Sequence, residues 1–67
     1  MDYMNNIIKT INQLKGDKSI SEIAKECKIP QQTMSRYMLN KNEIKVNNLC
    51  ALADYFDITL DELVGRK

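Results

Sequence analysis

The sequence contains no histidine and no tryptophan among its 67 residues, and it has only one proline and two glycines. Without histidine, proton transfer would depend on carboxylates, lysines, tyrosines or cysteines, and no pairing of a nucleophile with a base is recognisable among them. A glycine-rich loop that could hold a phosphate group is also missing. These absences predict that the protein is not an enzyme and that it uses no cofactor.

Long hydrophobic runs are absent as well. A membrane-spanning helix needs about 20 consecutive apolar residues, whereas the apolar residues here, 43% of the total, are dispersed along the chain. The N-terminus shows no charged and then apolar leader before a cleavage site. We therefore expect a soluble, cytoplasmic protein without a membrane partner.

The two cysteines, Cys27 and Cys50, lack the nearby histidine or second cysteine that a metal site requires. Their neighbours are apolar, so we predict that both are buried thiols that act as small hydrophobic side chains, without a disulfide. A group of acidic residues lies nearer the C-terminus, at Asp54, Asp57, Asp61 and Glu62. The last two are explained by the favourable position of a carboxylate at a helix N-terminus, so we predict no metal site.

The length of the chain limits what it can build. A chain of this size hides only about 60% of the surface that its unfolded form exposes, which allows one small core but no deep substrate cavity. No linker, internal repeat or low-complexity stretch divides the sequence. The sequence therefore predicts a single domain that spans residues 1–67.

Apolar residues recur at intervals of three and four, as on one face of an α-helix. Between Tyr3 and Lys15 this pattern predicts a helix that Gly16 can end, with an inward face of Met4, Ile7, Ile8, Ile11 and Leu14. A broader apolar face begins at Val46 and predicts a well-buried helix that ends near Asp57, with Leu49, Cys50, Leu52, Ala53 and Phe56 facing inward.

Two segments have the spacing of a capping box, in which a Ser or Thr and a Glu three residues later satisfy each other's backbone N–H groups. The first box predicts a helix over residues 20–27, and the second predicts a short helix through about residue 64. The boxes are formed by Ser19 with Glu22 and by Thr59 with Glu62.

The only proline, Pro30, separates the second helix from a third. The residue before a proline is pushed out of the helical region, so the second helix must end before Ile29, and Pro30 suits the first turn of a new helix. That third helix spans residues 31–39. Asn40 can take the left-handed conformation that ends it, before a polar connector over residues 41–45. Five helices and no strand result, so we predict an all-α fold.

Two helices joined by a three-residue turn can bind DNA when the second helix exposes polar groups. The segment 31–39 meets this condition, because its apolar face is formed by Met34, Tyr37 and Met38 while the opposite face carries Gln31, Gln32, Ser35 and Arg36. Glutamine can bond to adenine and arginine to guanine, with about 1–3 kcal/mol of discrimination for each good pair. Between residues 25 and 45, five cations and two anions give a local charge of +3, which favours a nucleic-acid partner.

A polar helix face is more often simply solvated. That interpretation is weakened here because the face lacks carboxylates, lies at the start of the helix and follows a tight turn. Leu39 lies in the middle of this face and does not fit the pattern. Either it lies beyond the last regular turn, or it contacts a sugar, a thymine methyl group or a partner subunit.

Two runs of residues together resemble one known family. The run from Ser19 to Lys41, S-I-S-E-I-A-K-E-C-K-I-P-Q-Q-T-M-S-R-Y-M-L-N-K, resembles the helix-turn-helix of Cro and phage-repressor (Xre-type) transcriptional regulators. The run from Asn47 to Val64, N-N-L-C-A-L-A-D-Y-F-D-I-T-L-D-E-L-V, is similar to the fourth and fifth helices of that family. With the first helix, the likeness covers nearly the whole chain. It implies a five-helix, lambda-repressor-like DNA-binding domain.

Position by position, the resemblance implies which residues touch DNA. It implies base contacts in the major groove from Gln31, Gln32 and Arg36, with support from Ser35. It implies phosphate contacts from Ser19, Thr33, Asn40, Lys41, Asn42 and Lys45. Glycine is customary where Lys28 stands and serine where Pro30 stands. Either Lys28 is held in a strained left-handed conformation, or the turn differs slightly from that of the family.

The resemblance also implies a mechanism, namely occupancy of a double-stranded DNA operator with an inverted repeat. Two subunits related by a two-fold axis would place their third helices about 34 Å apart. A net charge of only +1 per chain favours a homodimer, at least on DNA, because one copy would make few phosphate contacts. We expect a transcriptional regulator, most simply a repressor, that binds no small-molecule ligand.

Two alternatives follow from the same observations. The chain is either a small Cro-like protein or the DNA-binding part of a longer one, because no sensing domain accompanies the DNA-binding segment. A function of another class is a helical protein-interaction module, such as the antitoxin-like half of a toxin–antitoxin pair, in which the same fold mainly holds a partner protein.

Overall fold

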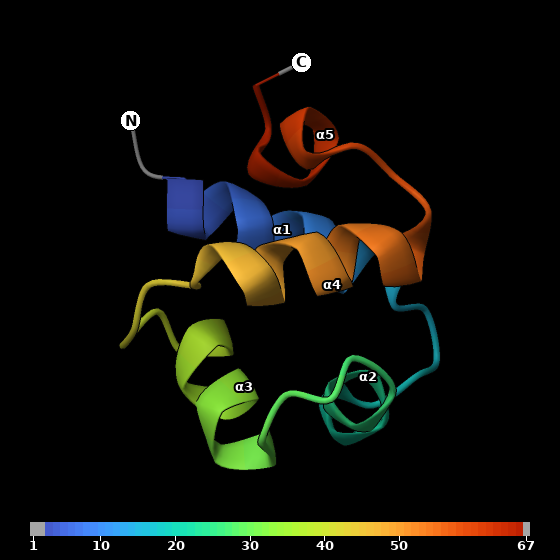
Figure 1. The fold of residues 1–67 in the computed structure, drawn as a ribbon, viewed down its shortest axis with the longest axis vertical. Helices are drawn as coiled ribbons and strands as arrows, with labels where there is room; N and C mark the ends of the chain where they lie inside the picture. Colours follow the sequence, from blue (N-terminus) through green and yellow to red (C-terminus); the bar gives the residue numbers. More distant parts are fainter. Residues whose placement is uncertain (1–2, 67) are drawn as a thin grey trace.

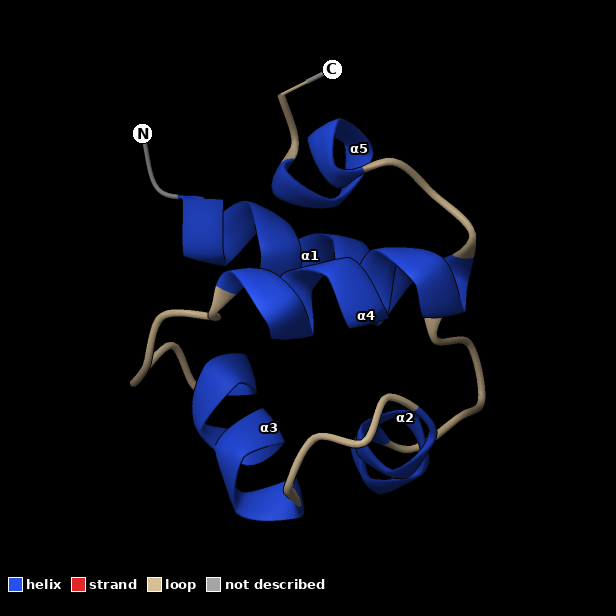
Figure 2. Ribbon diagram, viewed as in Figure 1, coloured by secondary structure: helices blue, strands red, loops and turns tan. Residues whose placement is uncertain are grey.

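The computed structural model describes residues 3–66, and these form five α-helices. They are α1 (Tyr3–Leu14), α2 (Ile20–Glu26), α3 (Gln31–Met38), α4 (Val46–Phe56) and α5 (Leu60–Val64). No strand occurs among the described residues, and the predicted all-α fold is confirmed (Figure 1 and Figure 2). Between residues 3 and 66, no helix combines the length and apolar character needed to cross a membrane.

Every helix contributes one large side chain to the centre of the core. These fully buried side chains are Ile11, Ile23, Met34, Leu52 and Leu63. Helix α1 packs against α5 and α3, α2 against α3, and α4 against α5. Figure 1 shows α1, α4 and α5 in the upper part of the molecule and the pair α2 and α3 in the lower part. The shared core therefore holds α2 and α3 at a fixed position on the other three helices.

Helices α2 to α5 end in the same hydrogen-bonded arrangement, in which the residue after the last helical turn is left-handed. In α2, the Ile29 N–H donates to the Ala24 carbonyl at 2.9 Å and the Lys28 N–H donates to the Lys25 carbonyl at 3.2 Å, which is a Schellman motif. The left-handed residues that end α2, α3, α4 and α5 are, in that order, Lys28 (φ 59°), Asn40 (φ 57°), Asp57 (φ 56°) and Gly65 (φ 76°). The left-handed Asn40 is confirmed. At Lys28 the first alternative holds, since a lysine takes the conformation that glycine adopts with less strain.

Both predicted capping boxes are confirmed. Ser19 Oγ accepts from the Glu22 N–H at 3.1 Å, and Thr59 Oγ1 accepts from the Glu62 N–H at 3.1 Å. The glutamate carboxylates accept in return from the Ser19 and Thr59 backbone N–H groups, each at 3.3 Å. These boxes fix where α2 and α5 begin, and with them the direction in which each helix leaves the preceding loop.

The placement of Pro30 and Leu14 differs from the prediction. Pro30 is the N-cap of α3, with an extended backbone (ψ 138°), and therefore precedes the helix instead of lying in its first turn. Leu14 was predicted to face inward but is 46% exposed. It lies at the last position of α1, where the surface opens into a shallow depression that it borders together with Thr10, Gln13, Ile58 and Glu62.

The two cysteines are free but only half-buried, so the prediction of buried thiols is corrected. Cys27 lies at the C-cap of α2, and its thiol donates to the Ala51 carbonyl at a Sγ···O distance of 3.8 Å. Partial burial raises the pKa of the Cys27 thiol, and the Glu26 carboxylate raises it further. Cys27 is therefore held as a neutral thiol that packs between α2 and α4.

Candidate nucleic-acid interface

Two buried side chains fix the rotation of α3 about its axis. Met34 is fully buried and Tyr37 is 2% exposed, and Met38 packs half-buried against the same core. The Tyr37 hydroxyl accepts a hydrogen bond from Asn48 Nδ2 at 2.8 Å, which ties α3 to α4. As predicted, this apolar face is turned inward. The opposite face of α3 must therefore point to solvent.

The outward face of α3 carries the four side chains for which base contacts were predicted. Gln31, Gln32, Ser35 and Arg36 are all exposed, and together they line one shallow depression of about 320 Å³. The structure thus brings the four predicted residues together on a single surface. This surface contains amide, hydroxyl and guanidinium groups, which are donors and acceptors for hydrogen bonds, and no carboxylate.

One of these four residues is tied to α2. Gln31 Nε2 donates to Ser21 Oγ at 2.7 Å. Within residues 3–66, the side chains of Gln32, Ser35 and Arg36 form no such bond and remain free to meet a partner. Ser21 was not predicted as part of the site. It lies ten residues from Gln31 and on another helix, so helical spacing alone gives no signal for this contact.

The start of α3 is open to an anion. No described side chain forms a capping hydrogen bond there, and the first turn holds no acidic residue. The backbone N–H groups and the dipole at such a helix start favour a phosphate group. The polar depression and the uncapped helix start therefore lie at the same end of α3.

The six residues with predicted phosphate contacts lie in three places. Lys41, Asn42 and Lys45 are exposed in the loop between α3 and α4, and Asn40 at its beginning donates from Nδ2 to Asn5 Oδ1 at 3.3 Å. Thr33, in the first turn of α3, is half-buried. The sixth residue, Ser19, is occupied by its capping box.

Ser19 is the weakest of these candidates. Its hydroxyl lies 3.4 Å from the Glu22 carboxylate, which would repel a phosphate group placed beside it. The positively charged loop after α3 and the start of α3 are better placed, because no described carboxylate bonds to their side chains.

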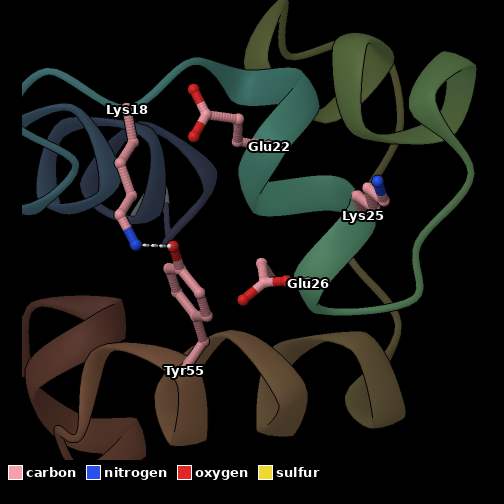
Figure 3. Close-up of a pocket in the computed structure, with 5 residues that line it drawn as sticks. All are labelled: Lys18, Glu22, Lys25, Glu26 and Tyr55. Carbon is pink, nitrogen blue, oxygen red and sulfur yellow. Dashed lines mark hydrogen bonds between the residues drawn. The ribbon is translucent and has the colours of Figure 1, made fainter.

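A second depression, of about 340 Å³, lies between α2 and α4 and has a different character (Figure 3). Lys18 and Tyr55 point toward each other there, and Lys18 Nζ donates to Tyr55 Oη at 2.8 Å. This hydrogen bond raises the pKa of Lys18 above its ordinary value of 10.5. The same depression is lined by Glu22 and Glu26. Because its lysines lie beside glutamates, this depression is a poor site for a polyanion, and its side chains instead connect α2 and α4.

The arrangement of α2, turn and α3 defines a helix-turn-helix domain. A family model described as helix-turn-helix matches residues 8–63, which is most of the chain. The chain belongs to this family, the Cro and phage-repressor type of helix-turn-helix regulators, and the predicted resemblance is confirmed. A search of curated proteins and a search of solved structures find no significant match to the chain.

Membership of the family gives the general function. The family consists of DNA-binding proteins and is not a family of enzymes. The protein is therefore a DNA-binding transcriptional regulator, and its partner is double-stranded DNA.

Proposed function

We propose that the protein represses transcription by occupying an operator with an inverted repeat, as a two-fold homodimer that places α3 in the major groove. The observation that carries this proposal is the outward face of α3, where Gln31, Gln32, Ser35 and Arg36 line one depression. An α-helix fits the major groove of B-DNA, and side chains at its start reach the base edges. The whole chain, residues 1–67, acts as one domain in this proposal.

The side chains on this face match the groups that bases present. A glutamine amide can accept from adenine N6 and donate to N7, and the Arg36 guanidinium can donate to guanine O6 and N7. Each good pair of this kind contributes about 1–3 kcal/mol of discrimination. We assign Gln31, Gln32 and Arg36 to base contacts, with Ser35 in support.

Phosphate contacts would hold α3 in the groove. The exposed side chains of Lys41, Asn42 and Lys45 follow α3 closely, Asn40 precedes them in the chain, and Thr33 lies at the other end of α3, in its first turn. Since the net charge is only +1, one chain would make few such contacts and bind weakly. Two chains on one operator double the number of contacts, which is why the proposal requires a dimer.

The dimer is proposed to contain two copies of this chain, related by the two-fold axis of the operator. Leu39, which lies just after α3, is 65% exposed, and Val46 at the start of α4 is 73% exposed. Leu39 is the C-cap of α3 and so lies beyond its last regular turn. Two exposed apolar side chains on either side of the loop after α3 are consistent with a contact to a partner subunit.

Selection of bound duplexes from a randomised pool tests this proposal directly. The expected result is an inverted repeat whose half-sites are about one helical turn apart, with preferred bases that change when Gln31, Gln32 and Arg36 are replaced by alanine together. The matched control is Gln13→Ala, an exposed glutamine on α1, which should leave the selected sequence unchanged.

Salt dependence separates this function from the alternative of a protein-interaction module. Fluorescence anisotropy with a random-sequence duplex should show affinity that falls as salt rises, and Lys41→Ala should reduce the slope by about one. Binding that does not respond to salt, or no binding at all, would favour a module that mainly holds a partner protein.

A further inference from the structure

A serine on α2 contacts the first residue of the DNA-binding helix. Gln31 Nε2 donates to Ser21 Oγ at 2.7 Å, and both side chains are otherwise exposed. Ser21 precedes Ile23 and Ala24, which are 0% and 1% exposed, so its hydroxyl is carried by a helix that the core holds firmly. The bond therefore links the Gln31 side chain, which has many rotamers, to a helix that is held in place by the core.

We propose that Ser21 is a positioning residue that determines base specificity by holding the Gln31 amide in one orientation. The inference rests on the proposed function, because it concerns how Gln31 meets a base in the major groove. Ser21 itself touches no base in this proposal and acts only through Gln31.

The hydrogen-bonding capacity of glutamine makes this role possible. A glutamine amide has two N–H donors and one carbonyl acceptor. Ser21 uses one of the N–H donors, and the second N–H and the Oε1 acceptor remain. This remaining pair is what adenine N7 and N6 require. Adenine is therefore the base that we expect at the position that Gln31 contacts.

Holding the amide before binding also lowers the cost of binding. A free glutamine side chain has many rotamers, and ordering it on DNA costs conformational entropy. Gln31 is already ordered by Ser21, whereas its neighbour Gln32, among the residues that the structure describes, has no side-chain hydrogen bond. Gln32 is therefore an internal comparison for Gln31 in the same chain.

The test on DNA uses the whole chain with Ser21→Ala. Binding is measured on the selected operator and on operators with each other base at the position that Gln31 contacts. Loss of one neutral hydrogen bond should reduce discrimination at that position by about threefold to tenfold and leave the other positions unchanged. Ser21→Thr keeps the hydroxyl and should restore the discrimination. In a Gln31→Ala background, Ser21→Ala should have no further effect, since the two residues act as one unit.

A second measurement requires no DNA. Side-chain amide relaxation by NMR should show Gln31 more ordered than Gln32 in the free protein, and Ser21→Ala should make the two alike. Asn12→Ala, an exposed substitution on α1, is the control that should leave both amides unchanged. Thermal melting of Ser21→Ala should match that of the unaltered protein, which excludes a general loss of structure.

Three results would overturn the inference. Ser21→Ala could weaken all duplexes alike, which is the signature of a phosphate contact; it could leave discrimination unchanged; or its effect could add to that of Gln31→Ala. Failure of the proposed function looks different. In that case the unaltered protein shows no sequence preference while the Gln31 amide is still ordered by Ser21, and the role in specificity falls with it.

Discussion

Helices α2 and α5 begin with side-chain caps, whereas no side chain within residues 3–66 caps the start of α3 or α4. In the capped helices the third residue is a glutamate, so a carboxylate already lies at the positive end of the helix dipole. The N-cap residues of α3 and α4 are Pro30 and Lys45, and no acidic residue lies in the first turn of either helix. The protein thus supplies its own anion to the starts of α2 and α5 and leaves the starts of α3 and α4 open.

The open helix starts coincide with the predicted DNA contacts. Gln31, Gln32 and Thr33 form the first turn of α3, and the polar loop that ends at Lys45 leads into α4. Open N–H groups at a helix start favour a phosphate group, whereas a capped start with a carboxylate repels one. In this chain, a helix start that contributes to stability therefore has a capping Ser or Thr and a glutamate, whereas a helix start predicted to contact DNA has neither.

The largest effect is expected when an open start is given a carboxylate. Gln32→Glu removes a proposed base contact and places a negative charge beside the DNA phosphates, so operator affinity should fall by about 100-fold or more. The same change favours the helix dipole, so the free energy of unfolding should not fall. Anisotropy and thermal melting measure the two effects. The control is Gln13→Glu on α1, and an equal loss of affinity in that variant would contradict the comparison.

Removing the side-chain cap of α2 or α5 should lower the stability of the protein. Thr59→Ala removes the cap of α5 and should lower the free energy of unfolding by about 1 kcal/mol, with DNA affinity unchanged. Ser19→Ala should destabilise α2 by a similar amount. Urea denaturation measures both losses. Anisotropy should show no loss of DNA affinity in either variant. If Ser19→Ala lost affinity while Thr59→Ala did not, the capped start of α2 would also contact phosphate, which would contradict the comparison.

A smaller effect is expected in the turn that leads to the open start of α3. Lys28 is left-handed (φ 59°), a conformation that glycine takes without steric cost. Lys28→Gly should therefore stabilise the protein by about 0.5–1 kcal/mol in urea denaturation. Lys28→Ala removes the charge but keeps the strain, and it should give no such gain. Equal stabilities for the two variants would show that the turn carries no strain.

The smallest effect is expected beside the capped start of α2. Tyr55→Phe removes the hydrogen bond from Lys18, and since Lys18 is exposed the fall in Tm should be less than that of either cap variant. This bond raises the pKa of Lys18, so its contribution is complete below the ordinary value of 10.5 and is lost as pH rises through the folded-state value. Thermal melting should show that the difference in Tm between the unaltered protein and Tyr55→Phe is smaller at strongly alkaline pH than at neutral pH.

Most of the fold could be predicted because its signals are local. Each helix begins at the predicted residue. A side-chain cap or a proline marks the start of α2, α3 and α5, and the onset of the apolar pattern marks the start of α1 and α4. Helices α1 to α4 end one residue earlier than predicted. The C-cap residue can still fit the hydrophobic pattern of the helix in the sequence, although it forms only part of the helical hydrogen bonds. The exposure of Leu14 could not be predicted, since periodicity gives the face of a helix and not how far its neighbours extend along it.

The candidate site shows the same division. The four side chains on the outward face of α3 could be placed together from helical spacing, because they share one helix. The bond between Gln31 and Ser21 could not, because it depends on the angle at which two helices meet. That angle is set by the turn at Lys28 and by packing of buried side chains such as Ile23 and Met34, which a linear pattern does not contain.

The repeated left-handed endings of α2 to α5 have a consequence for how the chain reaches this structure. Each ending closes a hydrogen bond across six residues, as between Ile29 and Ala24 or between Ile58 and Ala53. The reversals of chain direction are therefore encoded in short stretches and do not wait for distant segments to meet. Domains dominated by such near-neighbour contacts fold in microseconds to milliseconds. A newly made chain should accordingly spend little time with its apolar surfaces open to aggregation.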